Sequence, residues 1–127
     1  MADFSDYLEN AILNTFFRNQ AFTPAAGAYL ALYTAAPTDA GGGTEVSGNG
    51  YARKAVTFGA ASGGAISNTA AVSFTAAGGN FGTISHVGIF NAATGGNLLA
   101  WKAITPILIT DGDTITFPIG DIDVTQD

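Results

Sequence analysis

The sequence predicts a mainly β protein: an antiparallel, jelly-roll-like β-sandwich of about eight strands, preceded by one N-terminal amphipathic α-helix. Three observations predict it. Short stretches of alternating apolar and polar residues recur from residue 28 onwards, glycine-rich clusters separate them, and only residues 3–19 show helical spacing. Because 127 residues suit one domain, we expect the helix at 3–19 and the sandwich at 27–127 to form a single domain over 1–127.

Residues 3–19 carry the predicted helix. Its apolar stripe consists of Phe4, Tyr7, Leu8, Ala11, Ile12, Thr15 and Phe16, widened by Leu13 and Phe17. Asp3 or Ser5 can cap its start, and Arg18 suits its C-terminal end. A linker, 20–26, follows. Such a helix either covers the sheet of its own domain or docks on a partner, and the sequence does not decide between the two.

The first strands flank the longest irregular stretch. Residues 28–34 alternate as a strand, and residues 36–50 have the Pro, Gly, Asn and Ser content of a surface loop. Loops this long often make contacts. Residues 51–58 are predicted to form a strand with Val56 and Phe58 inward and with Arg53 and Thr57 outward. Residues 70–75 are predicted to form the next strand.

Residues 82–104 are predicted to form a central hairpin around a Gly95-Gly96 turn. In its first strand, alternation places Ile84, His86, Gly88 and Phe90 on one face and Ser85, Val87 and Ile89 on the other. Both faces are mostly apolar, so we expect both to be covered. Leu98, Leu99 and Trp101 form the apolar part of the second strand, which Pro106 is expected to end after Ile104.

The remaining residues are predicted to add a second hairpin. Thr110-Asp111-Gly112-Asp113 is an Asp-Gly turn signal. After it, Ile115, Phe117 and Ile119 face one way, and Ile122 and Val124 complete the pattern. The strand order stays open, because alternation does not reveal pairing.

Composition excludes several classes of protein. The net charge is −6 with four basic residues, so nucleic-acid binding is not expected. There is no cysteine, hence no thiolate metal site, and we expect no cofactor. Without a basic signal region or a long apolar run, we expect a soluble protein that does not bind membranes. Charged residues are only 11% against about 25% in an average domain, which favours a surface partly covered by neighbours.

No constellation of residues predicts an enzyme or a metal site. His86 is the only histidine, and its strand predicts a structural role. The aspartates Asp111, Asp113, Asp121 and Asp123 fit turn and edge positions, with weak divalent-ion binding as the alternative. The Gly-Gly clusters lack the Lys-Ser or Lys-Thr of a phosphate loop. The aromatic residues Trp101, Tyr29, Tyr33 and Tyr51 leave a sugar-stacking surface open as an alternative to core or interface packing.

Four stretches resemble a known family: YLENAILNTFFR (7–18), LALYTAAPTDAGGGTEVSGNGYARKAVTFGAASGGAISNT (30–69), GTISHVGIFNAATGGNLLAWKAI (82–104) and GDTITFPIGDIDVTQD (112–127). They resemble small virion structural proteins of tailed bacteriophages, usually labelled tail-fibre or minor structural proteins, of which related modules decorate capsids. The resemblance implies a non-enzymatic protein that is assembled in the host cytoplasm into the virion. It also implies contacts with other virion proteins, either the major capsid protein or tail proteins.

Within that resemblance, the sequence lacks the Gly-X-Y or heptad run that a fibre shaft needs. We therefore favour a capsid decoration (cement) protein that binds between capsomers, stabilises the head and forms a homotrimer. The alternatives are a tail-fibre or tail-adaptor component and a host-surface carbohydrate-binding module. The predicted partner interface joins one helix face to the long loop: Tyr7, Leu8, Ile12, Phe16, Pro37, Thr44, Val46 and Asn49.

Overall fold

The structure is a computed structural model that describes residues 3–24 and 27–125. The predicted linker 20–26, the single domain 1–127 and the sandwich 27–127 therefore each lie partly outside the described residues. The prediction of a mainly β, antiparallel fold with one helix near the N-terminus is confirmed. The elements are β1 (Asp3–Phe4), α1 (Asp6–Phe17), β2 (Ala28–Ala35), β3 (Thr44–Glu45), β4 (Lys54–Val56), β5 (Ala65–Ser67), β6 (Val72–Thr75), β7 (Gly82–Phe90), β8 (Leu98–Ile109), β9 (Thr114–Phe117) and β10 (Asp123–Thr125).

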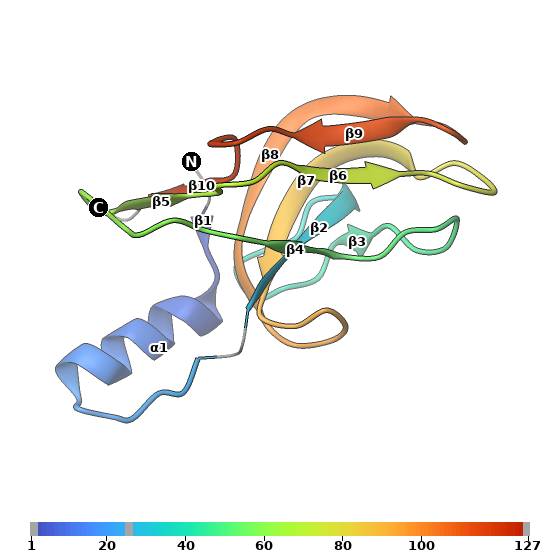
Figure 1. The fold of residues 1–127 in the computed structure, drawn as a ribbon. Helices are drawn as coiled ribbons and strands as arrows, with labels where there is room; N and C mark the ends of the chain where they lie inside the picture. The colour runs from blue at the N-terminus through green and yellow to red at the C-terminus, as the bar shows by residue number, and fades with distance from the viewer. Residues whose placement is uncertain (1–2, 25–26, 126–127) are drawn as a thin grey trace.

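The largest sheet is built on the β7–β8 hairpin. Its strands run in the order β1-β8-β7-β2-β3, and β4 also pairs with β2 (Figure 1). The hairpin prediction is therefore confirmed, and the long β7 lies between β8 and β2. Apolar residues on both faces of β7 and β2 match this central position, because a strand with neighbours on both sides can be covered above and below.

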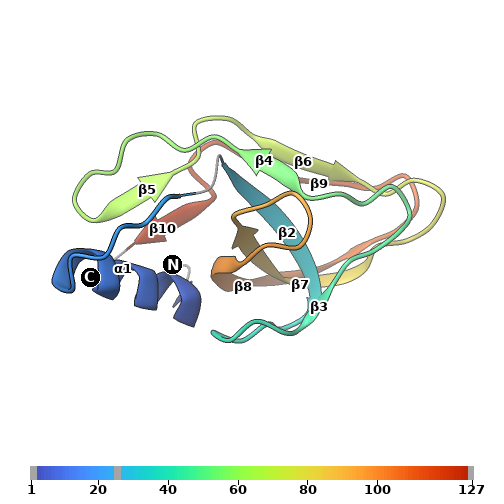
Figure 2. The same ribbon diagram turned by 90° about the horizontal axis from the view of Figure 1, so that it is seen from below.

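Two short ribbons cover one face of this sheet. β6 pairs with β9 and β5 pairs with β10, and both ribbons lie in the upper layer of the molecule as Figure 1 shows it. The main core lies between the layers, and its largest fully buried members are Leu30, Leu32, Phe74, Ile84 and Ile109. Figure 2 shows the same arrangement from below, with β6 and β9 side by side.

A buried asparagine joins the two ribbons. Asn68 is 1% exposed, and its amide donates to the carbonyl oxygens of Ala70 at 2.8 Å and Pro118 at 3.1 Å. Its side-chain oxygen accepts from the Ile122 N–H at 2.9 Å. One side chain thus satisfies three backbone groups at the point where the chain passes from one ribbon to the other.

The opposite face of the large sheet carries a smaller apolar cluster. Ala31, Tyr33, Phe90 and Leu98 are buried there, and Trp101 packs against them. Tyr33 and Phe90 stack with their ring centroids 6.4 Å apart. Loops, rather than a second sheet, cover this face, and the candidate site described below lies on it.

The hairpin differs from its prediction in two ways. Ile84 does not share the face of His86, because the pairing of β7 with β8 shifts register between these residues and Ile84 joins the main core with Val87. Pro106 does not end β8, which runs on to Ile109. Proline is tolerated because it lies between Ala103 and Ile107, where the pairing of β8 with β7 shifts register and the regular ladder is interrupted.

The Asp-Gly turn forms, but the hairpin predicted around it is wrong. The Asp113 N–H donates to the Thr110 carbonyl at 2.9 Å and Gly112 has φ +88°, yet β8 does not pair with β9, which pairs with β6 instead. The turn therefore carries the chain from one layer to the other.

Two strand assignments were also incomplete. Of the predicted strand 51–58, Lys54–Val56 forms β4 and Phe58 makes only an isolated bridge to Asn68, and the short strands β3 and β5 were missed. The described residues consequently hold ten strands rather than about eight.

The helix is shorter than predicted and projects from the sheets. α1 covers Asp6–Phe17, while Phe4 belongs to β1, and no α1 residue is buried. Figure 1 shows α1 extending away from the strands from its N-terminal end. Within the described residues, no helix has the length and apolar character needed to cross a membrane.

Candidate interaction site

The N-terminal end of α1 is fixed to the large sheet by hydrogen bonds. Ser5 is 1% exposed, and its hydroxyl accepts from the Leu8 N–H at 3.2 Å as an N-cap and donates to the Leu98 carbonyl. The Ser5 N–H donates to the Leu99 carbonyl and the Asp6 N–H donates to the Asp39 carbonyl, each at 2.8 Å. The start of the helix is therefore held by both β8 and the 36–43 loop.

The rest of α1 presents apolar side chains to solvent. Leu13, Phe16 and Phe17 are 53%, 76% and 81% exposed. Their spacing of three and four residues places them on one face of the helix. We call these three residues the apolar helix face. Such a set of large exposed side chains is a feature of interaction surfaces.

Of the four helix residues predicted for the interface, Phe16 belongs to the apolar helix face. Tyr7 is 37% exposed, and Leu8 and Ile12 are half-buried. Leu13 and Phe17 were in the predicted apolar stripe but not in the predicted interface.

The four loop residues of the predicted interface lie in different surroundings. Pro37 and Val46 are buried within this chain, Val46 as part of the main core. Thr44 and Asn49 are exposed, and the Asn49 amide donates to the Asn80 carbonyl at 2.8 Å. The buried pair therefore positions the loop, whereas Thr44 and Asn49 are accessible.

A cavity of about 390 Å³ opens between the start of α1, the 36–43 loop and the β7–β8 turn. The residues that give it chemical character are Tyr7, Tyr33, Asp39, Glu45, Phe90 and Asn97. Sequence reasoning missed it as a site, because its walls come from segments far apart along the chain. Gly43 shapes the loop: a Cβ there would lie 2.7 Å from the Pro37 backbone nitrogen.

Glu45 and Phe90 of the cavity lining belong to a charged network centred on Arg53. Its guanidinium donates to both Glu45 carboxylate oxygens, at 2.9 Å each, and its Cζ lies 3.6 Å from the centroid of the Phe90 ring. It also donates to the carbonyls of Ala92 and Gly95 in the β7–β8 turn. Arg53 therefore does not point outward, as predicted, because these partners bury all but 9% of its side chain.

The network shifts the ionisation of three neighbouring groups. Burial raises the pKa of Glu45, but the hydrogen bonds from Arg53 and Tyr51 outweigh it and hold that pKa below its usual value. Burial, followed by the nearby Glu45 charge, raises the pKa of Tyr33 to about 12. Burial and the hydrogen bond to Glu45 also raise the pKa of Tyr51. Near neutral pH the cavity lining thus holds an ionised Glu45 and a neutral Tyr33.

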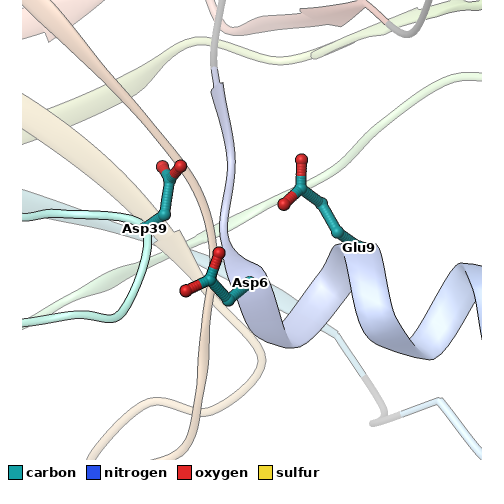
Figure 3. A group of neighbouring side chains, drawn as sticks. All are labelled: Asp6, Glu9 and Asp39. Atoms are coloured by element: carbon teal, nitrogen blue, oxygen red, sulfur yellow. The ribbon is translucent and has the colours of Figure 1, made fainter.

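Three carboxylates converge at the rim of the cavity. Figure 3 shows Asp6 and Glu9 on the first turn of α1 and Asp39 on the facing loop. One oxygen of each lies within 4.8 Å of the others, and all three residues are exposed. We call them the acidic rim. The N-terminal end of the helix dipole favours two of them, and the Trp101 indole N–H donates to Asp39 at 2.9 Å.

The late aspartates have structural partners. Asp111 accepts from the Gly78 N–H, and Asp123 lies 3.5 Å from the Lys102 Nζ. Asp113 accepts from the Thr110 N–H and hydroxyl, and these bonds lower its pKa. In the chain as described, these aspartates and Asp121 do not form a group of three with converging oxygens.

His86 is half-buried rather than enclosed by its strand. Its Nδ1 lies 2.8 Å from the Ser85 hydroxyl, and its ring centroid lies 6.1 Å from that of Trp101. These contacts fit the predicted structural role.

Comparison with known proteins identifies the family. A family model described as "Podophage GP4 fiber I protein gp80" matches residues 3–125, nearly the whole chain. No curated protein matches. The match confirms the resemblance to tailed-phage virion structural proteins and implies contacts with other virion proteins. The chain therefore belongs to the podophage GP4 fiber I protein gp80 family, a family of phage tail-fibre-type structural proteins, and is a component of the virion.

Proposed function

We propose that this chain is a non-enzymatic assembly module of a phage fibre, joined to a neighbouring virion protein through α1. The observation that carries the proposal is the apolar helix face, on which Phe16 and Phe17 remain 76% and 81% exposed. No residue of α1 is buried. Of the two roles that the sequence left open for the helix, docking on a partner therefore has the stronger support.

Phe16 and Phe17 offer most of the apolar area that a partner could bury on α1. Each buries about 150–250 Å² when fully covered, so a partner would remove about 300 Å² of their apolar surface from water. At about 25 cal/mol per Å², this would contribute about 8 kcal/mol before the entropy cost of association. A partner that covers α1 therefore gains a large share of the affinity that assembly needs.

The family supports a fibre component over the capsid decoration protein that the sequence favoured, because the matched family is named for a fibre. No contact described above favours a position between capsomers. The homotrimer stays a prediction, and the mass of the purified chain in solution tests it.

A carbohydrate-binding role through the aromatic residues has less support. Tyr33 is 3% exposed and Tyr51 is half-buried with its hydroxyl bonded to Glu45. The Trp101 indole N–H is occupied by Asp39. These rings therefore do not form one exposed stacking surface.

The test is incorporation into particles. Phage made without this chain would be mixed with purified wild-type protein, with Phe16→Asp/Phe17→Asp, or with the conservative Phe16→Leu/Phe17→Leu. We expect wild type and the Leu variant to bind particles, and the Asp variant to remain folded but unbound. Binding of the Asp variant at the wild-type level would contradict the proposal, and so would its failure to fold.

A further inference from the structure

We infer that the cavity beside the start of α1 receives an arginine side chain from the neighbouring virion protein. The inference rests on the proposed function, because it names the chemistry of the partner that α1 meets. It is carried by the acidic rim, by a buried tyrosine in the cavity wall and by an intramolecular arginine site next to it.

The acidic rim lacks a positive partner within the residues that the structure describes. The salt bridges among the described residues are Arg53–Glu45 and Lys102–Asp123. Neither includes Asp6, Glu9 or Asp39. Carboxylates held this close repel one another, so a cation placed among them is favoured. Of these three residues Asp39 also lines the cavity, so the acidic rim adjoins it.

Tyr33 adds an observation that is independent of the acidic residues. Only 3% of Tyr33 is exposed, and it lines the cavity. Its hydroxyl makes no hydrogen bond to the described residues. Tyr33 shares the cavity lining with Asp39 and Glu45, so a group that enters the cavity can approach its side chain. A neutral phenol oxygen can accept a hydrogen bond from a guanidinium group.

The protein already binds one arginine with the same chemistry. Arg53 lies against the Phe90 ring, bonds to the Glu45 carboxylate and donates to two loop carbonyls. The cavity offers a similar combination, because Glu45 and Phe90 also line it, together with the Asp39 carboxylate, two tyrosine side chains and the rest of loop residues 39–43. Its 390 Å³ is the volume of about a dozen waters, which is enough for a side chain.

Charge indicates that the arginine comes from a different protein rather than from a second copy. The chain has ten acidic and four basic residues, and Arg53 and Lys102 are already paired. A second copy would therefore bring mainly negative charge to the acidic rim. A basic partner that covers the apolar helix face would bury its apolar side chains and would also neutralise the charge of the acidic rim.

The single tryptophan provides the test, because its indole N–H donates to Asp39. The ¹⁵N-labelled full chain would be titrated with N-acetylarginine N-methylamide, with its uncharged isostere N-acetylcitrulline N-methylamide and, separately, with calcium chloride. We expect a saturable shift of the indole resonance with the arginine probe and none with the citrulline probe.

Variants locate the effect. Asp39→Asn keeps an oxygen for Trp101 but removes the charge, and should weaken the arginine probe about tenfold or more, whereas Tyr33→Phe should weaken it less. Asp121→Asn makes the same charge change on an exposed residue away from the cavity and should have no effect. No saturable shift, equal shifts with citrulline, or no effect of Asp39→Asn would overturn the inference.

The calcium arm separates a metal site from an arginine site. Saturable calcium binding without arginine binding would also overturn the inference. Failure here leaves the particle test of Phe16 and Phe17 unaffected, so the two proposals can fail separately.

Discussion

Two pairs of phenylalanines in this protein have opposite surroundings. Phe74 on β6 and Phe117 on β9 are 1% and 5% exposed, and their rings meet edge to face at 6.3 Å. Phe16 and Phe17 on α1 are 76% and 81% exposed. The first pair has the large sheet as a second layer, whereas the second pair has none within the described chain.

If the proposed function holds, the β6–β9 region carries stability and α1 carries assembly. Burial of the β6–β9 pair contributes to folding, because the unfolded chain exposes those rings to water. The α1 pair is as exposed in the folded chain as a solvent-facing side chain, so its apolar area is available for a partner. Substitutions of the same chemistry should therefore have different consequences in the two regions.

The largest expected effect comes from truncating a core ring. Phe74→Ala should lower the free energy of unfolding by about 3–5 kcal/mol, because it removes buried apolar contacts and leaves a cavity. The matched Phe16→Ala should change it by less than about 0.5 kcal/mol. Urea denaturation of both variants checks this, and equal losses would show that α1 packs on its own chain in solution.

A smaller loss is expected at the buried asparagine. Asn68→Ala should cost about 2–3 kcal/mol, because the Ile122 N–H and the Ala70 and Pro118 carbonyls lose their partner. Asn10→Ala on the exposed surface of α1 should stay within about 0.5 kcal/mol of wild type. Thermal unfolding of the two variants measures the contrast, which would disappear if water replaced the Asn68 side chain without cost.

The smallest stability effect is expected at the charged network, and it depends on pH. Folding holds the pKa of Glu45 below the value of about 4.3 that it has in the unfolded chain. The ionised Glu45 therefore stabilises the folded state fully above that unfolded pKa. This stabilisation is lost as the pH falls through the lower pKa of the folded state. Because Glu45 is partly exposed, we expect about 1 kcal/mol. Glu45→Gln should flatten this acid limb in denaturation curves from pH 7 to pH 3, and an acid limb identical to that of the wild type would contradict the assignment.

The regular features of the fold were predictable from local sequence. Alternation identified β2, β6, β7 and β9, and the glycine-containing turn identified the β7–β8 hairpin. The same rules failed where distant partners decide the structure. An Asp-Gly turn predicts a reversal but not which strands pair, and Pro106 reads as a strand end unless the register shift between β8 and β7 is known.

The site was less predictable, for the same reason. Apolar helical spacing looks alike whether a helix covers its own sheet or a partner, so Leu13 and Phe17 were visible only as parts of a stripe, although Phe16 was assigned to the interface. The cavity depends on contacts such as the Trp101–Asp39 hydrogen bond, which joins residues 62 positions apart. Arg53 was placed outward by alternation, although Glu45 and Phe90 cover it.

The central claim is that α1 folds exposed in the free chain and is covered in the virion, and amide hydrogen exchange tests it most directly. In the isolated chain, α1 amides beyond the first turn should exchange much faster than those of β7, because few contacts hold the helix. In particles, the same α1 amides should become protected while those of β7 stay unchanged. Equal exchange of α1 in the free chain and in particles would contradict the account.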